Sequence, residues 1–86
     1  MKKIKLNKGF IAQKLGNKLT IFDGEKSVLY TFNETASLIF QKIKLGWGEN
    51  QIVDSMVKKY KIKEEKARRD MDEFLKVLSK NGITSP

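Results

Sequence analysis

The chain contains no cysteine and no histidine among its 86 residues. These two absences exclude disulfide bonds, thiolate nucleophiles, imidazole bases and the commonest zinc ligands. A chain of this length buries only roughly two thirds of its unfolded surface, which leaves little room for a deep catalytic pocket. We therefore expect a non-catalytic protein with no catalytic residues, no bound metal and no cofactor.

Long hydrophobic runs are also missing. The basic start of the chain is followed by no extended apolar segment, because Lys8, Gln13 and Lys14 interrupt each candidate. This pattern excludes a signal peptide and a transmembrane helix. The sequence therefore predicts a cytoplasmic protein without a membrane partner.

Positive charge is abundant, and nearly all of it comes from lysine. The formal net charge is +8, and Arg68 and Arg69 are the only arginines. Proteins that read nucleic acid usually rely on the bidentate guanidinium of arginine. We interpret the charge as an attraction to an anionic partner, an acidic peptide in the first place and nucleic acid as the rival.

The first part of the chain has the pattern of a β-meander. Gly16-Asn17 and Asp23-Gly24 are turn signals between apolar runs, and Asp-Gly can supply the positive φ angles of a tight turn. A basic lead-in over residues 1–8 is expected to be poorly anchored, although Ile4 and Leu6 could extend a strand. The three predicted strands span Phe10–Leu15, Lys18–Phe22 and Lys26–Phe32.

The second part has helical periodicity. Asn33 is a strong N-cap residue, Gly46 a natural helix terminator, and Ile83 is expected to fold back after Gly82. The predicted helices span residues 34–45, 49–60 and 63–80. The chain is therefore expected to form a single α+β domain over residues 1–86, a three-stranded antiparallel sheet with three helices on one face.

Two stretches resemble the pyrroloquinoline quinone biosynthesis protein D family. Tyr30–Phe40 looks like the family's strand-to-helix signature, an apolar strand running into Leu-Asn-x-Thr-Ala/Gly, with Phe32 where leucine is usual. The stretch from Ala67 to Ile83 is similar to the family's Asp-Val-x-x-Phe-Leu-x-x-Leu-x-x-x-Gly-Leu helix, with Met71 for valine. The resemblance covers about residues 10–84.

The resemblance implies a function in peptide biosynthesis. Members of the family have a winged helix-turn-helix-like fold and recognise the leader segment of ribosomally made, post-translationally modified precursor peptides. They present the leader to a modifying enzyme, such as a radical S-adenosylmethionine enzyme, a cyclase or a leader peptidase. A chain of this length is similar to the small leader-binding chaperones of lasso-peptide and quinone-cofactor pathways.

The resemblance also implies a binding site, because the leader of the family adds a strand to the edge of the third strand. Val28, Leu29 and Tyr30 would form the floor, and one flank of the last helix would form the other wall. The sequence leaves open whether that flank carries Asp70 or Arg68, and the resemblance favours the first because Asp70 matches the family's recurring aspartate. The candidate peptide-binding residues are Lys26, Ser27, Val28, Leu29, Tyr30, Thr31, Lys66, Arg69, Asp70 and Glu73.

Three other interpretations remain open. The chain could be a winged-helix DNA-binding regulator, although Asp70, Asp72 and Glu73 would then face phosphates. Asp70 and Glu73 are three residues apart, so an acid/base pair in a small enzyme is geometrically conceivable. The free sheet edge could also pair two copies, so the sequence allows a monomer or a weak dimer.

Overall fold

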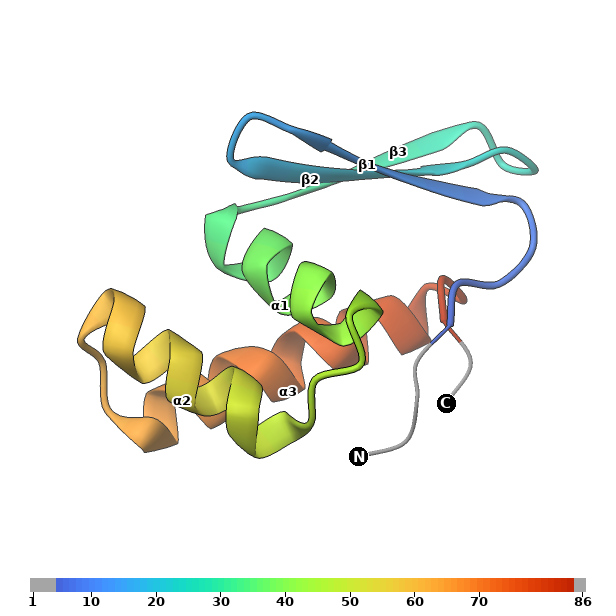
Figure 1. The fold of residues 1–86 in the computed structure, drawn as a ribbon. Helices are drawn as coiled ribbons and strands as arrows, with labels where there is room; N and C mark the ends of the chain where they lie inside the picture. The colour runs from blue at the N-terminus through green and yellow to red at the C-terminus, as the bar shows by residue number, and fades with distance from the viewer. Residues whose placement is uncertain (1–4, 85–86) are drawn as a thin grey trace.

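The computed structural model describes residues 5–84, which form a three-stranded sheet followed by three helices (Figure 1). The sheet lies on one side of α1, and α2 and α3 pack on the other side of that helix (Figure 1). The predicted α+β arrangement is confirmed. The elements are β1 (Phe10–Leu15), β2 (Lys18–Asp23), β3 (Val28–Phe32), α1 (Glu34–Lys44), α2 (Glu49–Tyr60) and α3 (Glu64–Lys80).

The sheet is an antiparallel meander in the order β1-β2-β3. Gly16 takes a positive φ of 61° in the two-residue turn that brings Leu15 opposite Lys18, as the Gly-Asn signal predicted. Alternate side chains of β2 point to opposite faces, and Leu19 and Ile21 are buried on the face toward the helices. The opposite face of the sheet lies away from the helices (Figure 1).

The connection between β2 and β3 differs from the prediction. Asp23 is buried, and its Oδ1 accepts hydrogen bonds from the backbone amides of Glu25 at 3.0 Å and Lys26 at 3.2 Å. These bonds hold a four-residue connection in place of a tight Asp-Gly turn, and its positive φ of 54° falls on Ser27. The third strand therefore begins at Val28, and the prediction that it includes Lys26 and Ser27 was wrong.

The ends of α1 follow their local sequence. Asn33 Oδ1 accepts from the amide of Ala36 at 2.9 Å, which confirms the predicted cap. At the other end Gly46 takes a φ of 85°, and the amide of Trp47 donates to the carbonyl of Lys42 at 3.0 Å. Trp47 is half-buried against the core, with the Lys42 ammonium 4.3 Å from the centre of an indole ring.

The core lies between the inner face of the sheet and the three helices. The end of α3 closes it, since Gly82 takes a φ of 70° and the amide of Ile83 donates to the carbonyl of Leu78 at 2.9 Å. Ile83 is completely buried, as expected for a side chain that folds back after the helix. Within residues 5–84, none of the helices is both long and apolar enough to cross a membrane. The fully buried large side chains are Ile21, Ile39, Ile52, Val53, Met56, Met71, Leu78 and Ile83.

The segment before β1 is anchored, contrary to the prediction of a loose lead-in. Leu6 forms an antiparallel bridge with Thr84, and the amide of Asn7 donates to the carbonyl of Ile83 at 2.9 Å. The side chain of Asn7 also donates to the carbonyl of Gly82 at 2.8 Å. The prediction was wrong for these residues because the end of α3 supplies their partners. The first four residues of the lead-in lie outside the described part.

Replacing Asn33 by alanine should destabilise the protein by about 1 kcal/mol, because the amide of Ala36 then loses its acceptor at the start of α1. Urea unfolding followed by circular dichroism measures this loss. The control is Asn33→Asp, which keeps an acceptor and adds a favourable charge at the helix N-terminus. If both substitutions destabilise the protein equally, the side-chain cap is not the cause.

Candidate functional site

One edge of the sheet lies open next to the last helix. In the order β1-β2-β3, β3 pairs with β2 on one side only, and within residues 5–84 no further strand pairs with it. The ring of Phe32, at the end of β3, meets the ring of Phe74 on α3 edge to face, with centroids 5.3 Å apart. This contact fixes the end of the open edge against α3.

An open pocket of about 730 Å³ adjoins this contact. We call it the β3–α3 pocket. Its wall is built by the end of β3, the first turns of α1, the end of α2 and one side of α3. The residues that line it are Thr31, Phe32, Asn33, Thr35, Ala36, Ile39, Tyr60, Ile62, Lys66, Asp70, Glu73, Phe74 and Val77.

The charged groups of the β3–α3 pocket all come from α3. Lys66 Nζ lies 3.3 Å from Asp70 Oδ2, an ion pair between residues four apart, and Glu73 lies one turn further along. The pocket is thus lined by one lysine and two carboxylates, so negative charge is in excess there, whereas the whole chain has an excess of positive charge. The excess positive charge of the protein therefore acts outside this pocket. Among residues 5–84, no group of three or more acidic side chains is placed to hold a metal ion.

The structure decides which flank of α3 faces the open edge. Arg68 Nη2 donates to Asn50 Oδ1 at 2.9 Å, and the guanidinium lies 3.7 Å from Glu49 and 3.6 Å from Glu64. Because Asn50 and Glu49 belong to α2, the flank of Arg68 faces α2. The flank that carries Asp70 faces the pocket instead.

The predicted site residues are only partly brought together. Four of them line the β3–α3 pocket: Thr31, Lys66, Asp70 and Glu73. The pocket adjoins only the carboxyl end of β3, so the earlier residues of the strand do not form its floor. Those outside the wall are Lys26 and Ser27 in the connection before β3, Val28, Leu29 and Tyr30 along the strand, and Arg69 on the exposed side of α3.

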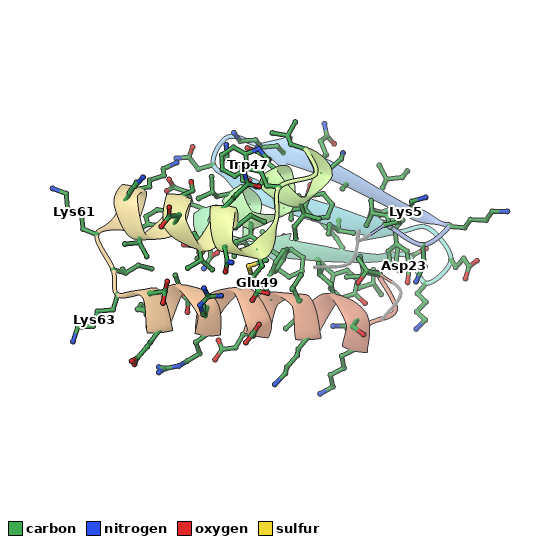
Figure 2. All side chains as sticks on the ribbon, turned by 60° about the horizontal axis from the view of Figure 1, so that its bottom comes forward. Lys5, Asp23, Trp47, Glu49, Lys61 and Lys63 are labelled. Atoms are coloured by element: carbon green, nitrogen blue, oxygen red, sulfur yellow. The ribbon has the colours of Figure 1, made fainter. Side chains whose placement is uncertain are left out.

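Several residues of the wall were missed by sequence reasoning. Tyr60 is the last residue of α2, and Ile62 follows the end of that helix, where Lys61 takes a φ of 52°. Lys61 and Lys63 extend into solvent on either side of this connection, at the opposite end of the molecule from Asp23 (Figure 2). The one sequence signal that Ile62 faces the pocket was its apolar side chain between two lysines, Lys61 and Lys63, which are both exposed.

The chain belongs to a known family. The family model described as Coenzyme PQQ synthesis protein D (PqqD) matches residues 19–83, which is more than half of the sequence. The resemblance inferred from the strand-to-helix signature and the last helix is thereby confirmed. No curated protein matches the chain.

Two solved structures have the same fold. The first, "Lasso peptide synthetase B1 complexed with the leader peptide", is 21% identical, with a TM-score of 0.91 over 99% of this chain and 100% of the other. The second, "TbiB1 in Complex with the TbiA(beta) Leader Peptide", is 16% identical, with a TM-score of 0.82 over 94% of each chain. At these identities the likeness concerns the fold.

Proposed function

We propose that this chain is a non-catalytic leader-peptide-binding protein of the cytoplasm. It captures the leader of a ribosomally made precursor peptide and presents it to a modifying enzyme or leader peptidase. The observation that carries the proposal is the open edge of β3 beside the β3–α3 pocket. Membership of the PqqD family supports it, as do the two similar folds, each described with a leader peptide.

Capture occurs by strand addition to β3. An extended leader segment pairs its backbone with the outward-facing amides and carbonyls of Val28–Phe32, and since this strand contains no proline, none of those amides is missing. These main-chain hydrogen bonds supply affinity that depends little on the leader's sequence. The affinity expected for such a complex is micromolar to nanomolar, roughly −8 to −12 kcal/mol.

Selectivity comes from the β3–α3 pocket. A leader side chain that enters it contacts the apolar surfaces of Phe32, Phe74 and Val77. Burial of that side chain contributes roughly 1.5–3 kcal/mol if it has the size of leucine or phenylalanine. Because Asp70 and Glu73 outnumber Lys66 there, an apolar or basic leader residue fits the pocket better than an acidic one.

DNA binding has weaker support. The guanidinium of Arg68 is already engaged by Asn50 and by two glutamates, Glu49 and Glu64. Of the two arginines of α3, Arg69 is therefore the one better placed to contact DNA. Asp70, Asp72 and Glu73 would also face the phosphates of a duplex if α3 entered a groove. These groups disfavour α3 as a recognition helix.

An amide NMR titration with the precursor peptide tests the proposal. Shifts should concentrate on Val28–Phe32 and on the flank of α3 that carries Asp70, because both contact the added strand. A peptide of scrambled sequence is the matched control and should give weaker shifts. Strand addition would be refuted by shifts that avoid β3, and broad shifts with short duplex DNA alone would favour the regulator.

A further inference from the structure

The outer face of the sheet carries an apolar row that crosses all three strands. Ile11 pairs with Phe22, and Phe22 pairs with Leu29, so the three side chains lie side by side on one face. They are 65%, 38% and 60% exposed, respectively. We call Ile11, Phe22 and Leu29 the outer row.

The fold does not need the outer row. The core packs on the opposite face, where the β2 residues Leu19 and Ile21 are buried. The next row on the outer face is polar, and there Thr20 Oγ1 donates to the backbone carbonyl of Gln13 at 3.0 Å. A contiguous apolar row beside an open sheet edge favours aggregation unless a partner covers it. The row is therefore better explained by a partner than by stability.

Charge restricts the nature of that partner. Residues 5–32 contain five lysines and no arginine, and their acidic residues are Asp23 and Glu25. Asp23 is buried in its turn, so within residues 5–32 the exposed carboxylate is that of Glu25. Lys18 lies on the outer face, since it alternates with Thr20 and Phe22 along β2, and it is exposed. Two copies packed face to face would bring these like charges together, which disfavours a homodimer. A surface with an apolar centre and a carboxylate rim complements the face.

The outer row ends at the edge where the leader is proposed to bind. Leu29 belongs to β3, so alternate side chains of an added strand would lie beside it and extend the row by one residue. A protein that covers the outer row would then contact the sheet and the leader at the same time. This position suits a protein that must distinguish the loaded chain from the empty one.

We propose that the outer row docks the enzyme that acts on the bound peptide, through an apolar patch with an acidic rim on that enzyme. The inference rests on the proposed function, since the enzyme is defined by the leader that the chain presents. It assigns a separate task to each face of the sheet: the inner face builds the core, and the outer face recruits the enzyme.

The test compares Ile11→Ser with Gln13→Ser, which place the same side chain on the same face of β1, in the outer row and in the polar row. Binding of the purified enzyme that modifies or cleaves the same precursor is measured by biolayer interferometry, with and without leader. Ile11→Ser should weaken enzyme binding by about tenfold, and Gln13→Ser by less than about twofold. Leader affinity, measured by fluorescence anisotropy, should be unchanged in both variants.

A second variant, Phe22→Ser, should reproduce the loss in enzyme binding, and thermal unfolding verifies that each variant is folded. Equal enzyme binding by Ile11→Ser and Gln13→Ser would overturn the inference. It would also be overturned if sedimentation showed a dimer of the wild-type chain that Ile11→Ser dissolves, or if the row bound anionic vesicles and not the enzyme. Failure of the wild-type chain to bind leader would instead refute the proposed function.

Discussion

Replacing Phe74 by alanine should destabilise the protein by about 3–5 kcal/mol, the largest effect expected from a single substitution here. Phe74 is only 6% exposed, and its ring meets Phe32 edge to face at 5.3 Å, an arrangement that adds about 0.5–1.5 kcal/mol to simple burial. The total stability of a domain of this size is roughly 5–15 kcal/mol, so much of it would be lost. Urea unfolding followed by circular dichroism measures the change.

The control for this substitution is Leu75→Ala. Leu75 is the next residue of α3, but it is only partly buried and does not line the β3–α3 pocket. Its truncation should cost well under half as much. Similar losses of stability at both positions would mean that the Phe32–Phe74 contact adds nothing specific to the stability of the protein. The contact would then not be what fixes β3 against α3.

Replacing Val77 by glutamate should weaken leader binding by about 100-fold with little change in stability. Val77 is 40% exposed and lines the apolar side of the β3–α3 pocket. A third carboxylate beside Asp70 and Glu73 would be desolvated by the incoming leader side chain, which is costly for an unpaired charge. Isothermal titration calorimetry with the precursor peptide gives the affinity.

Ser79→Glu is the matched control, because it adds the same carboxylate to α3 at an exposed position outside the pocket wall. It should leave the leader affinity within about twofold of wild type. A comparable loss from Ser79→Glu would indicate long-range repulsion and not occupancy of the pocket. Unchanged binding by Val77→Glu would remove α3 from the proposed binding site.

The parts of the fold that were predicted from sequence depend on contacts close along the chain. The cap of α1 requires only Asn33 and the amide three residues later. The ends of α1 and α3 require a glycine that accepts a positive φ, Gly46 and Gly82, followed by an apolar residue. In each case the residues that end the helix also make the contacts that end it, so the local sequence is sufficient. The predicted helices therefore agree with the structure to within one residue at each end.

Most of the parts that were not predicted depend on partners far away in sequence; the exception is the connection between β2 and β3, where Asp23 bonds to amides two and three residues later. Both Leu29 and Tyr30 are apolar, so alternation could not tell which of them faces the core. The choice between the flanks of α3 is made by Arg68 and its contacts with α2, across 18 positions in the case of Asn50. Ile62 joins the pocket wall only because α2 and α3 converge there.

The bond between Asn7 and the end of α3 has a consequence for the order of folding. It joins residues 75 positions apart, so it closes nearly the whole chain into a ring. The meander and the helix caps use partners close in sequence, and contacts of long separation generally form later because loop closure must precede them. We therefore expect the ring to close late in folding. We also expect the same seam to be among the first parts of the described chain to open in the native ensemble.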